Sequence, residues 1–93
     1  MDGDKSETRV FTVRNQLGIH ARPASLLAKT AKQYQSRITI EKHDTVVDVK
    51  SIMMLMTLAA DEGTPLSVTA TGEDASEALD AIEKLFTSKF GED

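Results

Sequence analysis

The sequence contains no cysteine, which excludes a disulfide framework and any metal site built on thiolates. It also lacks a long apolar run. The longest, residues 52–60, is interrupted by Thr57 and is far shorter than the roughly 18–20 residues of a membrane span. Residues 1–9 are polar and have none of the apolar segment that marks a signal peptide. We therefore expect a cytoplasmic protein that does not insert into a membrane.

Basic residues are not in excess. The net charge is −4, and the eleven lysines and arginines are scattered along the chain. Nucleic-acid binders usually show a basic patch, because phosphate contacts supply much of their affinity. With only two histidines and no clustered carboxylates, a zinc site has little support. We expect no nucleic acid, no metal and no cofactor.

What is present is typical of a folded domain. Hydrophobic residues make up 40% of the chain and charged residues 28%, a balance unlike that of disordered proteins. A chain of 93 residues holds a single core. We expect a flexible N-terminal tail at residues 1–8 and one domain at residues 9–93.

Apolar and polar residues alternate in four segments, as they do in strands that bury one face. The predicted strands are residues 11–14, 37–41, 47–49 and 66–71. Only a short polar link around His43 and Asp44 separates the second strand from the third, which permits a hairpin and forbids a helical crossover. The one aromatic residue of these strands is Phe11, and its spacing places it on the buried face.

Three further segments are predicted helices: residues 24–34, 51–59 and 75–86. Asp74 and Glu77 resemble a capping box at the start of the last helix, and Gly63 closes the short middle one. The order of elements is therefore βαββαβα. It predicts an α+β open-faced β-sandwich, in which a four-stranded antiparallel sheet carries three helices on one face.

Reactive side chains gather in residues 17–25, where a strand ends, Gly18 turns the chain and a helix begins. His20 falls at roughly the N-cap position, where Ser, Thr, Asp or Asn would stabilise the helix by about 1 kcal/mol more. A phosphate could accept hydrogen bonds from the free amides of Ala21 and Arg22 and from the Arg22 guanidinium. The helix dipole favours the neutral imidazole, which is the nucleophilic form. Gly18 would also leave room for a bulky partner.

Each of these residues also has an ordinary explanation. His20 fits a polar surface residue near a turn, and Arg22 fits a solvated residue at a helix start. Pro23 fits the first turn of a helix, where its missing N–H costs nothing. The residue types and their spacing leave both interpretations open.

Residues 18–24, Gly-Ile-His-Ala-Arg-Pro-Ala, resemble the active-site signature of the HPr family, the phosphocarriers of the phosphoenolpyruvate:sugar phosphotransferase system. Residues 50–58 resemble the second signature of that family, around its regulatory serine. The resemblance implies that His20 accepts a phosphoryl group at Nδ1 from enzyme I and passes it to enzyme IIA domains, with Arg22 stabilising the phosphate. It implies a phosphoryl carrier, not an enzyme.

Ser51 begins the short middle helix and fits an N-cap residue. The resemblance implies a second role, since the matching serine can be phosphorylated by HPr kinase/phosphorylase in some members of the family, mostly from Gram-positive bacteria. A dianion at this position would repel acidic partners. Met54 stands where family members under serine control often have glycine, and this departure weakens the second role.

The short helix also carries a candidate docking surface. Ile52, Leu55 and Ala59 suffice to bury one face, which leaves Met53 and Met56 either exposed for partners or used to fill the core. The residues that the resemblance assigns to docking are Ala21, Arg22, Ser25, Ile52, Met53 and Met56.

Other functions remain at this stage. A βαββαβ order also occurs in RNA-binding modules, but these stack bases on exposed aromatic residues of the sheet, which this chain does not offer. A hydrolase with His20 as general base would need an activated Ser or Cys and an orienting acid, which are missing near His20 in the sequence, and the chain is too small for a deep pocket. Within the HPr family, the sequence does not separate the sugar-uptake branch from the nitrogen-related branch, NPr. A monomer is the simplest state for a carrier that must expose its site.

Overall fold

A computed structural model describes residues 5–92 of the chain, and its elements follow the predicted order, with one added turn of 3₁₀ helix at the end. The strands are β1 (Ser6–Thr12), β2 (Arg37–Lys42), β3 (Thr45–Asp48) and β4 (Pro65–Thr71). The helices are α1 (Ala21–Ala31), α2 (Ile52–Met56), α3 (Ala75–Thr87) and the 3₁₀ turn η1 (Lys89–Gly91).

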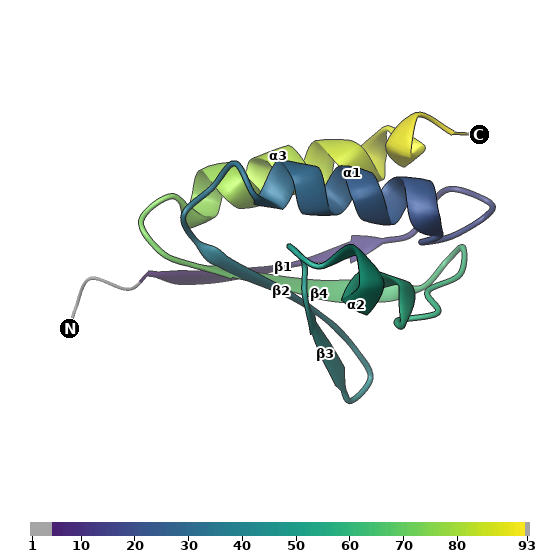
Figure 1. Cartoon of the computed structure of the whole chain (residues 1–93), viewed down its shortest axis with the longest axis horizontal. Helices are drawn as coiled ribbons and strands as arrows, with labels where there is room; N and C mark the ends of the chain where they lie inside the picture. Colours follow the sequence, from purple (N-terminus) through teal and green to yellow (C-terminus); the bar gives the residue numbers. More distant parts are fainter. Residues whose placement is uncertain (1–4, 93) are drawn as a thin grey trace.

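The four strands form one antiparallel sheet in the order β1-β4-β2-β3. Figure 1 shows α1 and α3 side by side over one face of this sheet, while α2 packs against α1 and β3 near one end. The helices drawn in Figure 1 do not cover the opposite face of the sheet. The predicted open-faced sandwich is thereby confirmed. No helix in residues 5–92 is both long and apolar enough to cross a bilayer.

The core lies between the sheet and its helices. Its inward strand residues include Phe11, Ile38, Ile40, Leu66 and Val68, and its helical residues include Leu27, Ala28, Leu79, Ile82 and Phe86. Burying a Leu, Ile or Phe side chain stabilises the fold by about 1.5–3 kcal/mol. Phe11 is 8% exposed, which confirms its predicted place on the buried face.

Strand β1 begins earlier than the sequence pattern predicted. Residues 6–8, which we expected in the tail, pair with β4, while residues 1–4 of that tail lie outside the described residues. The hydroxyls of Thr8 and Thr69 lie 2.7 Å apart across the two strands. On the helix side, Arg9 donates to Asp80 of α3 at 2.8 Å. Because polar side chains occupy both faces here, apolar alternation could not reveal this part of the strand.

The short helix α2 ends at Met56, three residues before the predicted end. Ala59 has a φ of 51°, a left-handed conformation that a right-handed helix cannot contain. Lys42 stabilises this turn by donating from Nζ to the carbonyls of Leu58 and Ala59, at 3.0 and 2.9 Å. The turn buries Leu58 and so ties the loop after α2 to the sheet.

The predicted capping box of α3 is wrong. Asp74 is the N-cap residue, but its side chain makes no capping hydrogen bond. Its carboxylate instead accepts the backbone N–H groups of Gln35 and Ser36, at 2.8 and 2.9 Å, and the Ser36 hydroxyl. These bonds, led by the one from the Ser36 hydroxyl, lower the pKa of Asp74. The side chain thus joins the α1–β2 loop to the start of α3.

Candidate functional site

His20 is the N-cap residue of α1, as predicted, with extended backbone angles and no side-chain capping bond. Its carbonyl accepts the Ala24 N–H at 3.0 Å, which begins the helix. Within residues 5–92, the N–H groups of Ala21 and Arg22 have no hydrogen-bond partner, and Pro23 has no N–H. Unpaired donors and the positive end of the helix dipole therefore lie beside an imidazole side chain that is 36% exposed.

The turn before His20 packs against the loop between α2 and β4. Gly18 has a φ of 73°, and a methyl group on its Cα would collide with the carbonyl oxygen of Ala60. The Ile19 amide donates to the same carbonyl at 2.9 Å. The expectation that Gly18 leaves room for a partner is wrong, because the chain itself fills that space. Glycine is needed here to fix the backbone that carries His20.

Glu92, which the sequence analysis did not single out, holds the imidazole. His20 Nε2 lies 2.8 Å from Oε2 and 3.1 Å from Oε1 of Glu92. The buried Asn15 donates from Nδ2 to Glu92 Oε1 at 3.0 Å and to the Gly18 carbonyl at 2.8 Å. The hydrogen bond from His20 is the main cause that lowers the pKa of Glu92. His20 and Glu92 are 72 residues apart, so no local spacing pattern could have found the pair.

The contact with Glu92 determines which ring nitrogen is available. An ionised carboxylate only accepts hydrogen bonds, so Nε2 of His20 must carry a proton to bind it. In the neutral imidazole the lone pair is then on Nδ1. Among the described residues, Nδ1 has no hydrogen-bond partner. The arrangement therefore presents Nδ1 as the nucleophilic nitrogen.

Arg22 lies beside the same carboxylate. Its Nη1 donates to the carbonyl of Phe90 at 2.8 Å and lies 3.4 Å from Glu92 Oε2. The side chain is 56% exposed. The structure thus brings His20 and Arg22 together around Glu92, whereas a contact of Arg22 with phosphate stays a prediction.

Glu92 is delivered by residues 89–92, which we call the C-terminal hook. Lys89 and Phe90 have φ values of 57° and 54°, in the left-handed region that costs a non-glycine residue roughly 1–2 kcal/mol. Phe90 is nevertheless only 1% exposed, and its ring centroid lies 5.0 Å from that of Phe86. Burial of Phe90 holds the hook against α3 and places Glu92 at the start of α1.

Ser51 is the N-cap residue of α2, and the Met54 amide donates to its Oγ at 3.2 Å. The predicted capping role is confirmed. Phosphorylation of Ser51 stays a prediction.

Helix α2 presents a group of apolar side chains to solvent. We call Ile52, Met53, Met54 and Met56, which are 38%, 80%, 44% and 47% exposed, the methionine patch. The alternative that methionines fill the core is wrong, because Leu55 and Leu58 occupy it and are 0% and 3% exposed. Ile52, expected to help bury one face, is instead partly exposed.

The remaining predicted docking residues, Ala21, Arg22 and Ser25, are also exposed, and they lie on the start of α1, which packs against α2. Leu17, which the sequence analysis did not single out, is 73% exposed in the turn before His20. Exposed apolar side chains thus lie both on α2 and in the turn before His20.

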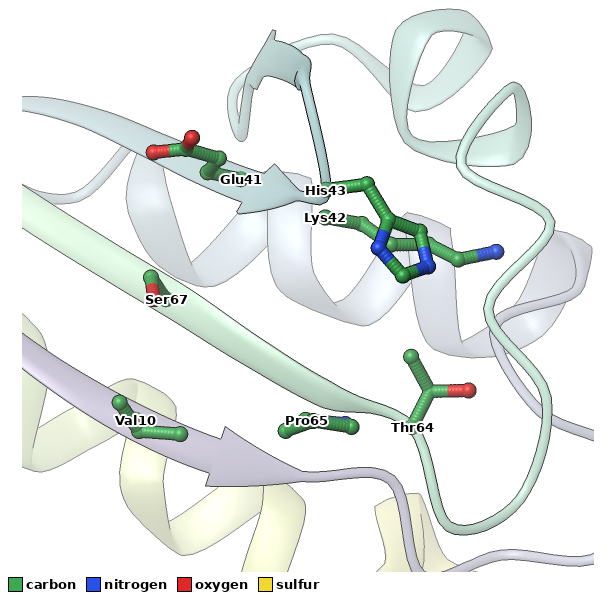
Figure 2. A pocket seen from close by; sticks show the side chains of 7 residues that line it. All are labelled: Val10, Glu41, Lys42, His43, Thr64, Pro65 and Ser67. Atoms are coloured by element: carbon green, nitrogen blue, oxygen red, sulfur yellow. The ribbon is translucent and has the colours of Figure 1, made fainter.

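A hollow lies elsewhere, on the uncovered face of the sheet. Figure 2 shows its lining side chains, with Val10 and Pro65 on one side and those of the β2–β3 hairpin across from them. The hollow has a volume of about 430 Å³. Its lining residues are Val10, Glu41, Lys42, His43, Thr64, Pro65 and Ser67. None of them is a predicted site residue. Among the described residues, no group of three or more potential metal-ligating side chains occurs.

Comparison with known proteins places the chain in a family. A family model described as "PTS HPr component phosphorylation site" matches residues 7–88. The phosphocarrier protein HPr of Xylella fastidiosa is 43% identical over 83 residues, covering 89% of this chain and 93% of that protein. That of Treponema pallidum is 43% identical over 86 residues, covering 90% and 98%.

The structural comparison agrees. The crystal structure of HPr-C-His from Thermoanaerobacter tengcongensis matches with a TM-score of 0.89 at 39% identity, covering 94% of this chain and 98% of that one. The matched region includes both sequence signatures, the first around His20 and the second around Ser51. The chain therefore belongs to the HPr family, the phosphocarriers of the phosphotransferase system.

Proposed function

We propose that His20 receives a phosphoryl group on Nδ1 from phospho-enzyme I and passes it to enzyme IIA domains in the cytoplasm. The observation that carries this proposal is the state of the ring at the start of α1. Glu92 binds Nε2 at 2.8 Å, which leaves Nδ1 as the nitrogen with a lone pair. The chain itself is the carrier, since the phosphoryl group enters and leaves on the same atom.

The start of α1 suits the phosphorylated form of His20. The amides of Ala21 and Arg22, which have no partner in the described part of the chain, can donate to phosphate oxygens, and the helix dipole favours a negative charge there. The Arg22 guanidinium is 56% exposed, and its Nη1 contacts the Phe90 carbonyl at 2.8 Å and Glu92 Oε2 at 3.4 Å. A shift of this exposed side chain would let it form charge-assisted bonds with a phosphate.

Partner proteins would dock on the methionine patch together with Ala21, Arg22 and Ser25. Methionine side chains are flexible and suit a surface that must accept several partner shapes. A shallow site also fits partners that are whole proteins. Phosphorylation of Ser51 by HPr kinase/phosphorylase would place a dianion beside Ile52, at the edge of this surface, and would weaken docking of acidic partners.

A labelling experiment tests the proposal. Phosphoenolpyruvate and enzyme I should introduce one acid-labile phosphate into the wild-type protein, and none into the His20→Ala variant. The matched control is His43→Ala, which removes the chain's other histidine, in the β2–β3 hairpin, and should be labelled like the wild type. Labelling of His20→Ala at the wild-type level would refute the site assignment. Rates with sugar-type and nitrogen-type enzyme I would identify the branch.

A further inference from the structure

We infer that Glu92 is a positioning residue for phosphoryl transfer: it holds the proton on Nε2 of His20 and presents Nδ1 to the incoming phosphorus. The inference rests on the proposed function and adds a residue from the C-terminal hook to the site.

The contact between the two side chains is close and sheltered. Both oxygens of Glu92 lie within 3.1 Å of Nε2, and the Glu92 side chain is only 16% exposed. The two nitrogens of an imidazole lie on different edges of the ring, so a carboxylate bound at Nε2 leaves the space in front of Nδ1 free. Glu92 therefore orients the ring without occupying the place of the phosphoryl group.

The carboxylate also has an electrostatic part in the reaction. The Nδ1 lone pair forms the bond to phosphorus, the bond from phosphorus to the donor atom breaks, and its electron pair stays on the donor. Nε2 keeps its proton throughout, so the substituted ring gains a positive charge. A carboxylate beside Nε2–H stabilises that charge, as an aspartate stabilises a catalytic imidazolium. Transfer to the next protein reverses the step and returns the lone pair to Nδ1.

The surroundings of Glu92 show that its position is fixed by the fold. Asn15 is fully buried and joins Glu92 Oε1 to the Gly18 carbonyl, in the turn that carries His20. Its buried Oδ1 has no hydrogen-bond partner among residues 5–92, so the bonds of Nδ2 determine how this amide is placed. The carboxylate and the imidazole are thus both attached to one short turn.

The backbone of the hook supplies a second, independent observation. Lys89 and Phe90 both adopt left-handed angles, and such strained residues gather where a side chain must be held for function. The burial of Phe90 holds the strained backbone in place.

Two variants and a control test the inference. Glu92→Ala removes the acceptor, and Glu92→Gln keeps the side-chain size but removes the charge. The control, Glu73→Gln, makes the same charge change at an exposed residue before α3, whose far end leads to the hook. With phospho-enzyme I as donor, both Glu92 variants should lower the kcat of phosphoryl transfer to His20 about tenfold, the lower end of the loss seen when a residue that orients a metal-binding histidine is removed. KM should change less than kcat, because Glu92 lies outside the methionine patch and contacts the other docking residues only through Arg22, at 3.4 Å.

A spectroscopic measurement separates positioning from a general structural effect. In wild-type protein with isotope-labelled histidine, NMR should show neutral His20 protonated at Nε2, with a proton that exchanges slowly with water. The signal should disappear in Glu92→Ala and remain in Glu73→Gln. Wild-type kcat in both Glu92 variants, or a proton on Nδ1 in the wild type, would overturn the inference. A wild-type protein that accepts no phosphoryl group would refute the proposed function itself.

Discussion

Replacing Lys89 by glycine should stabilise this protein, although it removes a large side chain. Lys89 has a φ of 57°, and its side chain is exposed. Among the described residues, that side chain makes no hydrogen bond or salt bridge. The substitution therefore removes backbone strain without removing packing.

The size of the effect follows from two opposing quantities. Left-handed angles cost a residue with a Cβ roughly 1–2 kcal/mol, and glycine avoids this cost. Glycine also gains freedom in the unfolded chain, which destabilises the native state by roughly 0.5–1 kcal/mol. The midpoints of the two ranges, about 1.5 and 0.75 kcal/mol, predict a gain of about 0.75 kcal/mol in the free energy of unfolding. For a domain of this size this gain raises Tm by roughly 3–6 °C.

Thermal unfolding of Lys89→Gly should be compared with that of Lys89→Ala, because alanine removes the same side chain and keeps the Cβ. The glycine variant should melt at the higher temperature of the two. A glycine variant that melts at the same temperature as the alanine variant, or below it, would show that the hook is not strained at this residue.

Three further predictions concern the turn, the pH dependence and the docking surface. Gly18→Ala should lower the free energy of unfolding by about 2–4 kcal/mol in urea titrations, since it adds left-handed strain to a collision with Ala60; a neutral effect would contradict the packing described. The pKa values of Asp74 and Glu92 are lowered in the folded state. The ionised carboxylates therefore stabilise the fold fully above their pKa values in the unfolded chain, near pH 4, and this contribution to the free energy of unfolding is lost as the pH falls further. The urea midpoint should therefore fall on acidification, and it should fall less in Asp74→Asn; equal acid sensitivity would argue against the Asp74 bonds. Met53→Lys should leave Tm within about 2–4 °C of the wild type, because the side chain is 80% exposed, and should raise KM for enzyme I; an unchanged KM would exclude Met53 from docking.

The order of the elements could be predicted because most strands and helices bury one face and so impose a period on the sequence. The start of β1 could not, since Glu7 and Arg9 put charged side chains on the helix side of the sheet. Asp74 was placed correctly as an N-cap residue, yet its carboxylate binds the α1–β2 loop. That loop is distant in sequence, so the local pattern suggested a capping box instead.

Only part of the candidate site could be predicted from the sequence. His20 could be placed at the start of a helix from its neighbours alone, because a helix start is a local feature. Glu92 and Asn15 could not be found, since their contacts depend on how the hook folds back over α1. The exposure of the methionine patch followed only partly from helical spacing, because Leu58 supplies the burial that Ala59 was expected to give.

The most direct test of the account is NMR on the phosphorylated protein with isotope-labelled histidine. The coupling between nitrogen and phosphorus identifies the phosphorylated atom, and the proton signal identifies the other nitrogen. We predict phosphorus on Nδ1 of His20 and a proton retained on Nε2. Phosphorus on Nε2 would contradict the account, because the nitrogen that Glu92 binds would then be the one that reacts. Phosphorus on His43 would contradict the assignment of the site to His20.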